Sequence, residues 1–454
     1  MSVNPADSVV FGTLFGTAPM RAVFDDRALI GRMLEVEGAL ALVQGRLGII
    51  PADAAAAIAA AARTDCVDLA ELGASVRTAG TPVVGLVRAL TKAAGPAGRW
   101  VHWGATTQDI IDSAVVLQIR AALELLRADL LALIAALARQ ADANRASVMA
   151  GRTFLQHALP ISFGLKCAGW MQPLISHVER LDQLSARILR VQFGGAVGTL
   201  ASLGAHGVAV LEGLAGELGL AAPAAPWHGA RDGMAECACW LGLVCGSLGK
   251  IATDIALLAQ TEVGEVSEPH EPGRGGSSTL PHKRNPIGAV HAIAAVRAAQ
   301  ALVPQMLSAM VLDHERGTGP WQSESLALGQ CFLLTAGALV HMLHDGVGLV
   351  VDAGRMRANL DLTNGLIMTE AVSMALAPRL GREAAHLAVK AASDLVLRDG
   401  ISLTQALAAV PAIGGGLSGA EIASLTDPAS YLGAANGFID RVLAAAAALP
   451  AGGA

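Results

Sequence analysis

Aromatic and charged residues are both scarce in this chain of 454 residues. Phe, Trp and Tyr make up 3% of the sequence and Asp, Glu, Lys and Arg 15%, whereas apolar residues make up 53%. Val, Ile and Thr rarely alternate with polar residues, so the pattern of a half-buried sheet is largely missing. Alanine-rich stretches such as residues 54–62 favour helix instead. The composition therefore predicts an all-α protein with a large core and more than one domain.

An excess of basic residues is also missing, and the formal net charge is −6. This balance argues against a surface for nucleic acid or an anionic membrane, but it is compatible with a local basic pocket for an acidic substrate. The first residues, Met1–Asp7, have neither the basic nor the apolar region of a secretory signal. Residues 325–343 carry no formal charge, but their polar side chains and glycines indicate a helix buried in protein. We expect a cytoplasmic protein that binds neither nucleic acid nor membrane.

Motifs for common cofactors are missing as well. The sequence has no Gly-x-x-x-x-Gly-Lys-Ser/Thr phosphate loop, no dinucleotide glycine fingerprint after a strand and no His/Cys spacing typical of a metal site. Cys237 and Cys239 lack a second ligand pair, and the other four cysteines are scattered through apolar stretches. Buried, reduced thiols explain them better than metal ligands, which fits a reducing cytosol. We expect neither a cofactor nor a metal.

Long helical patterns dominate the middle of the chain. No glycine or proline occurs between Gly104 and Gly151, and from Val116 to Leu137 apolar residues recur every three or four positions. This periodicity predicts one long helix packed against others at a shallow angle. Four further long helices are predicted over about residues 162–190, 241–258, 286–311 and 324–341. Their apolar content exceeds what one buried face needs, which favours partner chains over a self-contained monomeric bundle.

The expected organisation is three mainly helical domains. Residues 1–112 form an N-terminal helical domain in which Asp25–Leu47 is the clearest helix. Residues 113–351 form a central long-helix bundle. Residues 352–454 form a small C-terminal domain whose short helices are broken at Gly365, Gly381 and Gly400.

Polar sequence interrupts the predicted bundle at three places. The first is His102–Asp109, where Thr106 or Thr107 suits a helix N-cap; the free N–H groups of a helix start would also suit a carboxylate ligand. The second is Gly151–Pro160, which includes His157. This histidine could act as a general acid or base, although a lone histidine is more often a structural hydrogen-bonding residue.

The third and longest interruption is the 264–286 loop, which ends in Gly-Ser-Ser-Thr-Leu-Pro-His-Lys-Arg-Asn-Pro. Its glycines give mobility and its prolines prevent helix, so it could close over a substrate. Lys283 and Arg284 come just before a predicted helix whose N-terminal dipole adds positive potential. A serine in that field can be stabilised as an alkoxide and serve as a base. A solvated linker would explain neither the paired serines nor the Lys-Arg-Asn-Pro entry to the helix.

These three segments, in this order on long helices, resemble the fumarase/aspartase superfamily. Its most specific motif, Gly-Ser-Ser-x-x-Pro-x-Lys-x-Asn, matches residues 276–285. Within the superfamily, the chain resembles the bacterial 3-carboxy-cis,cis-muconate cycloisomerases. The resemblance extends from about residue 8 to residue 440 and includes the segments 101–109, 151–158, 192–198, 226–232, 314–316 and 359–366.

The resemblance implies a homotetramer with a twenty-helix core, and active sites that each draw residues from three subunits. It implies that Ser277 is the base acting next to a carboxylate, with His157 as a proton donor or carboxylate binder. Lys283 and Asn285 would bind a carboxylate and stabilise the developing charge. The other substrate-binding residues that it implies are His102, Thr106, Thr107, Gln156, Ser278 and Arg316. The expected substrate is a small polycarboxylate.

Two departures from known patterns bear on the reaction. Phe154 stands where fumarases and adenylosuccinate lyases carry histidine, and cycloisomerases also place an aromatic there. The expected reaction is therefore the closure of a lactone from 3-carboxymuconate. Trp321–Leu326 departs from the family's Trp-x-x-Glu-Trp pattern, so release of fumarate from a substituted succinate, such as nitrosuccinate or adenylosuccinate, is the alternative. A helical scaffold without activity is a third hypothesis, against which the intact Ser277, Lys283 and Asn285 argue.

Overall fold

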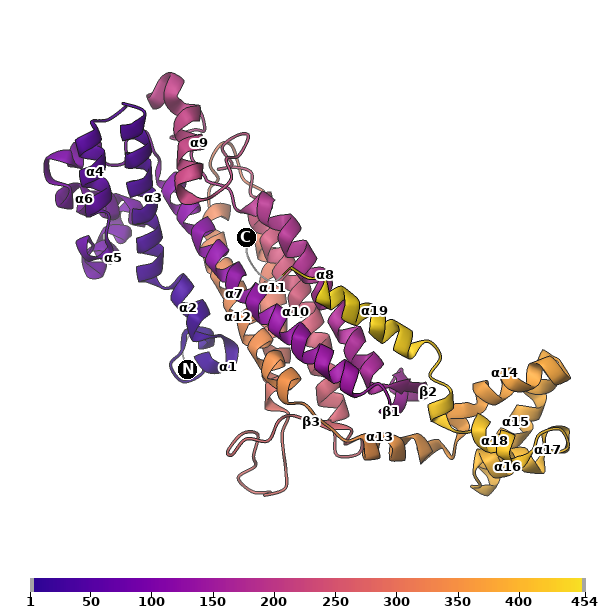
Figure 1. Ribbon diagram of the computed structural model, residues 1–454. Coiled ribbons are helices and arrows are strands. Elements are labelled where there is room, and N and C mark those ends of the chain that lie inside the picture. The colour runs from indigo at the N-terminus through magenta and orange to yellow at the C-terminus, as the bar shows by residue number, and fades with distance from the viewer. Residues whose placement is uncertain (1–3, 451–454) are drawn as a thin grey trace. The chain divides into compact units, whose positions relative to one another are not determined.

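The computed structural model describes residues 4–450 and is mainly helical (Figure 1), which confirms the predicted all-α class. Its five long helices are α7 Thr107–Ala143, α8 Phe163–Ile188, α10 Asp232–Leu258, α11 Ile287–Ser308 and α12 Pro320–Gly348. Each overlaps one of the predicted long helices. Helix α7 fills most of the interval that lacks glycine and proline, so no residue in it removes a backbone donor or loosens the backbone.

The described chain divides into two compact units. The first holds the chain up to Asp129, His177–Gly249 and His291–Val340, and the second holds Leu130–Ser176, Lys250–Val290 and the chain from His341 onward. Each long helix contributes one stretch to each unit. The units follow spatial packing, whereas the expected domains at 1–112, 113–351 and 352–454 follow chain order. Those domain bounds stay a prediction.

Shorter helices form the rest of the first unit: α1 Gly12–Phe15, α2 Ala18–Phe24, α3 Asp26–Arg46, α4 Ala52–Ala61, α5 Leu69–Ala79, α6 Pro82–Ala93 and α9 Gly207–Leu218. Asp25 caps α3 by accepting a hydrogen bond from the N–H of Ala28 at 2.7 Å. The helix predicted at Asp25–Leu47 is thereby confirmed. Helix α3 packs closely on α4, because a Cβ at Gly45 would lie 2.5 Å from that of Ala55. Small residues on both helices permit this approach.

Within the first unit, the long helices pack through small residues and buried thiols. A Cβ at Gly249 of α10 would lie 3.0 Å from Val296 of α11. Cys245 of α10 contacts Thr335 of α12 at 3.3 Å, and burial raises the pKa of this thiol to about 11. Cys66 and Cys239 are free but only partly buried. The other four cysteines are buried and free, as predicted: Cys237, Cys245 and Cys331 in this unit and Cys167 in the second. Thiols in such surroundings are unreactive and act as small apolar residues.

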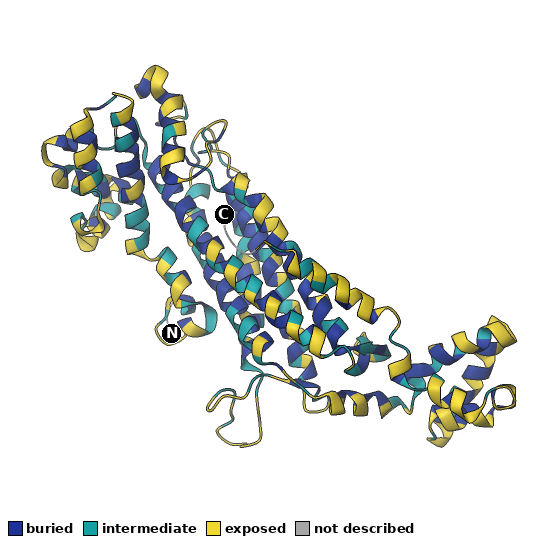
Figure 2. Cartoon of the chain, viewed as in Figure 1, coloured by how far each residue is buried: buried dark blue, intermediate teal, exposed yellow. Residues whose placement is uncertain are grey.

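Exposed positions remain along the long helices (Figure 2), and on α10, α11 and α12 they include large apolar residues. By length and composition alone, α10, α11 and α12 could each cross a membrane. Within this single chain, 72% of the most apolar stretch of α12 is buried, but only 33% of the corresponding stretch of α11. Exposed apolar residues on or just after α11 include Val290, Leu307 and Val311. Such a surface is typical of a helix that contacts other chains.

The second unit contains a β-hairpin that the hydrophobic pattern does not predict. Strand β1 Val148–Thr153 pairs antiparallel with β2 Gln156–Ser162. The two turn residues, Phe154 and Leu155, have φ values of 50° and 64°, a conformation that hairpin turns usually give to Asn or Gly. The sequence therefore lacks the usual hairpin signal. The short strands β3 Val266–Ser267 and β4 Val350–Val351 also pair antiparallel.

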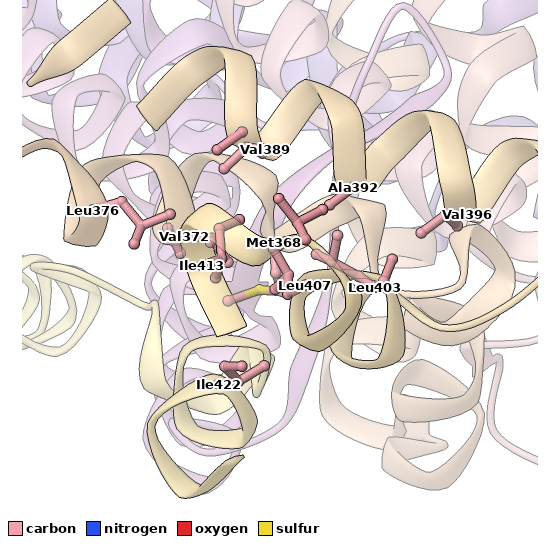
Figure 3. Packing of buried hydrophobic residues seen from close by; sticks show 14 of the residues in the cluster. Met368, Val372, Leu376, Val389, Ala392, Val396, Leu403, Leu407, Ile413 and Ile422 are labelled. Carbon is pink, nitrogen blue, oxygen red and sulfur yellow. The ribbon is translucent and has the colours of Figure 1, made fainter. Parts of the chain in front are cut away.

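The C-terminal helices belong to the second unit, and all but the last of them share a small core. They are α13 Ala353–Leu360, α14 Thr369–Leu380, α15 Arg382–Asp399, α16 Leu403–Ala409, α17 Pro411–Gly414, α18 Gly419–Leu425 and α19 Ala435–Ala447. Figure 3 shows Val372 and Leu376 of α14 packed with Val389 of α15 in this core. Gly381 and Gly400 flank α15 and have positive φ, which confirms the predicted breaks there. The described 3-10 helices of both units are Pro5–Asp7, Thr64–Cys66, Gly95–Trp100, Ala201–His206, Asp361–Thr363, Leu366–Met368 and Pro428–Ser430.

A buried ion network joins α7, α10 and α12 in the first unit. Arg231, just before α10, donates to Asp112 of α7 at 2.7 Å and to Glu324 of α12 at 2.6 Å. Trp321 also donates to Asp112, at 3.0 Å. Burial raises the pKa of Glu324, and the hydrogen bond from Arg231 opposes this shift. All three charged residues are buried, so each carboxylate depends on the guanidinium for compensation.

Replacing Arg231 with methionine should destabilise the protein. Asp112 and Glu324 would then be buried without a counter-charge, and we expect a loss of about 3–5 kcal/mol of unfolding free energy at pH 7. Their pKa values in the folded variant should exceed those in the unfolded chain, so the loss should shrink as the pH falls toward about 5. Chemical denaturation at both pH values measures this. Arg398→Met, which removes an exposed pair with Asp399, is the control; an equal loss in both variants would contradict the prediction.

Candidate active site

His102, in the segment before α7, lies against a buried glutamate of α3. Glu37 is 1% exposed, and its Oε1 lies 2.6 Å from Nδ1 of His102. Burial alone would lower the pKa of His102, but the hydrogen bond to Glu37 and its charge outweigh burial and raise the pKa. The backbone of His102 has a φ of 61°, a left-handed conformation that residues other than glycine rarely adopt. A histidine whose pKa is raised in this way is protonated more readily, and its protonated form suits the binding of a substrate carboxylate.

Asp109, in the first turn of α7, organises the backbone at the start of this helix. Its buried carboxylate accepts hydrogen bonds from the N–H groups of Thr106 at 2.9 Å, Gly194 at 2.8 Å and Gly195 at 2.9 Å. Nε2 of His228 lies 2.7 Å from the same carboxylate. Thr106 directly precedes α7, so it occupies the predicted cap position. Asp109 therefore joins three segments of the chain beside the positive end of the helix dipole.

Arg316 reaches the same helix start. Its Nη2 donates to the hydroxyl oxygen of Thr106 at 3.2 Å and to the carbonyl of Ala196 at 3.0 Å. Two of the predicted binding residues are thus in direct contact. We call His102, Thr106, Thr107 and Arg316 the first half-site; all four belong to the first unit. This half-site combines cations, hydroxyls and a helix start, which together suit a carboxylate.

The β1–β2 hairpin carries Gln156 and His157 directly after its turn. Arg152 anchors the hairpin by donating to both carboxylate oxygens of Glu265, at 2.9 and 2.6 Å. Glu265 is buried and also accepts a hydrogen bond from the side chain of Asn359 at 2.8 Å. Because Glu265 opens the 264–286 loop, this pair fixes the hairpin to the root of that loop.

His157 is half-buried, and its surroundings favour the neutral imidazole. Burial lowers its pKa, and the charge of Arg152 lowers it further, against an opposing effect of Glu265. Its Nδ1 is buried and accepts or donates no hydrogen bond within the described chain. A neutral imidazole can take up a proton or donate one neutral hydrogen bond at pH 7. These roles fit the geometry better than binding a carboxylate as a cation.

The tip of the 264–286 loop places Ser277 in a tight turn. Its Oγ accepts hydrogen bonds from the N–H groups of Thr279 at 3.2 Å and Leu280 at 3.1 Å. Two donors aimed at this oxygen would also stabilise an alkoxide there. The absence of helix over this loop and the start of α11 at Ile287, directly after the Lys-Arg-Asn-Pro segment, are as predicted.

Asn285 closes the base of this tip. Its backbone N–H and its side-chain Nδ2 both donate to the carbonyl of Gly275, at 2.9 and 3.0 Å. Ser278 and Lys283 lie between these points and are exposed. We call Gln156, His157, Ser277, Ser278, Lys283 and Asn285 the second half-site; all six belong to the second unit. The predicted residues thus fall into two groups, one in each unit.

Several residues that shape these half-sites were not predicted as site residues. The residues three and four positions from Glu37 along the helix, at 33, 34, 40 and 41, are all apolar. A carboxylate on such an apolar helix face is the signal that could have revealed it. Asp109, His228 and Asn359 lie in segments that carry the family resemblance, but their roles depend on contacts between distant parts of the chain. Glu265 opens the predicted loop, and its pairing with Arg152 has no signature in sequence spacing.

Comparison with known proteins identifies the family. A family model described as "Lyase" matches residues 15–299, and one described as "Adenylosuccinate lyase C-terminus" matches residues 365–442. The first match covers more than half of the chain. The solved structure of 3-carboxy-cis,cis-muconate lactonizing enzyme from Pseudomonas putida superposes with a TM-score of 0.93 at 43% identity, and covers 97% of this chain and 99% of that chain.

Curated relatives align along nearly the whole sequence. The 3-carboxy-cis,cis-muconate cycloisomerase of Pseudomonas aeruginosa is 48% identical over 98% of this chain and 97% of its own length, and that of Bradyrhizobium diazoefficiens is 45% identical over 97% and 99%. Nitrosuccinate lyase of Streptomyces davaonensis is 42% identical over 96% and 94%. The chain therefore belongs to the lyase family of the fumarase/aspartase superfamily, with the 3-carboxy-cis,cis-muconate cycloisomerases among its similar members.

Proposed function

We propose that this protein is a 3-carboxy-cis,cis-muconate cycloisomerase that works without a cofactor. The observation that carries the proposal is the 48% identity, over almost the full length of both chains, to an enzyme of that name. The complete Gly-Ser-Ser-x-x-Pro-x-Lys-x-Asn motif and the donors around Ser277 support it with a candidate chemical centre. The helical scaffold without activity is disfavoured, because it would not need this motif.

The reaction closes a lactone on a substrate with three carboxylates and two conjugated double bonds. One carboxylate oxygen forms a bond to the far carbon of a double bond that is conjugated to another carboxylate. The π electrons move onto the carbon beside that second carboxylate and give an enolate-like dianion. This carbon then takes a proton. One carboxylate becomes an ester, so each turnover takes up one proton from solution.

The second half-site supplies the groups for proton transfer and charge stabilisation. Ser277 would donate the proton to carbon during lactone formation and remove it in the reverse elimination. Lys283 and Asn285 would bind the carboxylate that carries the developing charge. His157, as a neutral imidazole, is a second candidate for proton transfer. Gln156 and Ser278 would donate hydrogen bonds to a substrate carboxylate.

The first half-site would bind the remaining carboxylates. Arg316 contributes positive charge, as does His102 when it is protonated, and Thr106 and Thr107 contribute hydroxyls at the start of α7. A trianionic substrate needs such donors on more than one side. We therefore propose that the first half-site of one chain faces the second half-site of another.

This arrangement fits a cytoplasmic homotetramer. Sites shared among three subunits follow if the hairpin residues and the loop residues of the second half-site come from different chains. Phe154 and Leu155, at the hairpin turn beside His157, are 99% and 72% exposed within one chain. Apolar side chains held in a strained turn are typical of a segment that packs against another molecule. The exposed face of α11 is a second surface that a partner chain would cover.

The alternative is a lyase that releases fumarate from a substituted succinate. The likeness to nitrosuccinate lyase favours keeping this second candidate. Ser325, which replaces the second aromatic of the family's Trp-x-x-Glu-Trp pattern, is exposed in the first turns of α12. Elimination would use the same serine base, because both reactions pass through charge beside a carboxylate.

Incubation with 3-carboxy-cis,cis-muconate tests the proposal directly. We expect loss of the diene absorbance together with uptake of one proton per molecule of lactone, followed with a pH indicator in weak buffer. Nitrosuccinate should give little fumarate or nitrite under the same conditions. Rapid release of fumarate from nitrosuccinate, without turnover of the muconate, would overturn the assignment in favour of the lyase.

A matched pair of loop variants serves as the control for this assay. Ser277→Ala should lower kcat by at least about 10²–10³, because it removes the proposed proton-transfer group. Thr279→Ser keeps the N–H that donates to Ser277 and should retain most of the activity. Full activity in Ser277→Ala would remove this serine from the mechanism.

Glu37→Gln should change the pH dependence of substrate binding. The variant lacks the charge that raises the pKa of His102, so burial should prevail and the imidazole should be neutral at pH 7. Because the wild-type pKa is raised, the cation is present at low pH and is lost as the pH rises through that value. We expect KM to rise about tenfold at pH 7 in the variant and to recover at lower pH. NMR titration of His102 and a KM profile measure this; an unchanged pKa would contradict it.

A further inference from the structure

A cluster of acidic and basic side chains holds the first part of the 264–286 loop, away from Ser277. Glu268, Glu271 and Arg274 come from the loop, and His344 and Asp345 come from the last turns of α12. All five belong to the second unit. None of them was predicted as a site residue, and none enters the proposed reaction.

Glu268 links the two ends of the loop. Its carboxylate oxygens accept hydrogen bonds from the N–H groups of Gly288 at 3.1 Å and Ala289 at 2.9 Å. These N–H groups lie in the first turn of α11, where a carboxylate satisfies free donors and interacts favourably with the helix dipole. The start of the loop is therefore fixed to the helix that follows its end.

Asp345 lies beside this cap and is completely buried. A Cβ at Gly288 would come 2.6 Å from its Oδ2, so the carboxyl group lies directly against the first turn of α11. Nη2 of Arg274 is 3.7 Å from Asp345 and 3.9 Å from Glu268. Oδ2 of Asp345 is buried and makes no hydrogen bond within the described residues. Two carboxyl groups thus share one guanidinium at the base of the loop.

His344 completes the cluster and connects it to Glu271. Its Nε2 lies 2.7 Å from Glu271 and its Nδ1 3.2 Å from Asp345. The other element packed here, α7, presents Leu133 and Ala136 to Gly346 and contributes no charge at that contact. Three carboxyl groups therefore face the guanidinium of Arg274 and the imidazole of His344. The net charge of the cluster is zero only when one carboxyl group is protonated and His344 is a cation.

We infer that Asp345 is a positioning residue that fixes the stem of the 264–286 loop, and with it the Ser277 tip, to α11 and α12. The stem comprises residues 268–274, and the tip comprises residues 275–285. Because Glu268 and Arg274 meet at Asp345, the stem stays attached while Asp345 can share a proton with its neighbours. A second full negative charge next to Glu268 would repel it and loosen the helix cap.

The pKa values of both α12 residues indicate how attachment should depend on pH. Burial, and then the charge of Glu268, raise the pKa of Asp345 from 3.8 to about 7. Burial alone would lower the pKa of His344, but its hydrogen bonds to Glu271 and Asp345 raise it. The attached stem thus binds protons more tightly than the detached one. Attachment is strongest at low pH and weakens as the pH rises through these values.

Hydrogen–deuterium exchange of the full-length protein tests this inference without substrate. After correction for intrinsic rates, we expect exchange in peptides covering residues 265–290 to rise about tenfold between pH 6 and pH 8. Asp345→Asn, which is neutral at every pH, should remove most of this rise and leave only the part that His344 and Glu271 contribute. Asp394→Asn, an exposed position on α15, should leave it unchanged. A loop whose exchange does not depend on pH, or a rise of undiminished size in Asp345→Asn, would overturn the inference.

A second variant and a kinetic readout separate positioning from simple loss of folding. Glu268→Gln weakens the helix cap and should raise loop exchange at both pH values, even if Asp345→Asn folds poorly. In the kinetic arm, which rests on the proposed function, kcat with 3-carboxymuconate should fall from pH 6 to pH 8 in the wild type more than in Asp345→Asn. Failure of the protein to act on this substrate would leave the exchange result intact and would count only against the proposed function.

Discussion

Burial of the apolar faces of five long helices is the constraint on which the rest of this structure depends. Much of the surface of these helices is apolar and therefore unfavourable in water. The helices pack on one another through small residues such as Gly249 and through the buried Arg231 network. Polar sequence is then restricted to the ends of helices and the connections between them. The candidate site residues lie at those ends: Thr106 and Thr107 at the start of α7, and Asn285 just before α11. The same constraint leaves the apolar face of α11 exposed within a single chain, where the proposed partner chains would cover it.

Electrostatics then gives similar residues different roles. Glu37 raises the pKa of His102 and so favours its cation, whereas burial and Arg152 lower the pKa of His157 and favour its neutral form. The first histidine is suited to binding charge and the second to moving a proton. Two buried carboxylates, one in each unit, position neighbouring segments of the chain and have no proposed contact with the substrate. Asp109 orders the start of α7, and Glu265 fixes the hairpin to the loop.

The sequence was sufficient to predict the long helices, the loop and the family, because each has a local signal. The interval without glycine or proline marks α7, and the 276–285 motif is contiguous. Contacts between distant residues have no such signal, so the roles of Glu37 and Asp345 emerged only from the structure. The β1–β2 hairpin was missed because Phe154 and Leu155 occupy a turn that usually carries Asn or Gly. The division into two half-sites also needed the spatial arrangement, since the segments alternate along the chain.

Complementation between two inactive variants tests most directly whether one chain's first half-site works with another chain's second half-site. Arg316→Met impairs the first half-site and Ser277→Ala the second. If different chains supply them, mixed tetramers of the two variants contain some sites with both half-sites intact, and about a quarter of wild-type activity should return. A mixture of Ser277→Ala with Asn285→Ala, both in the second half-site, should stay inactive. Mixed tetramers of the first pair, verified by native mass spectrometry but without activity, would contradict the account.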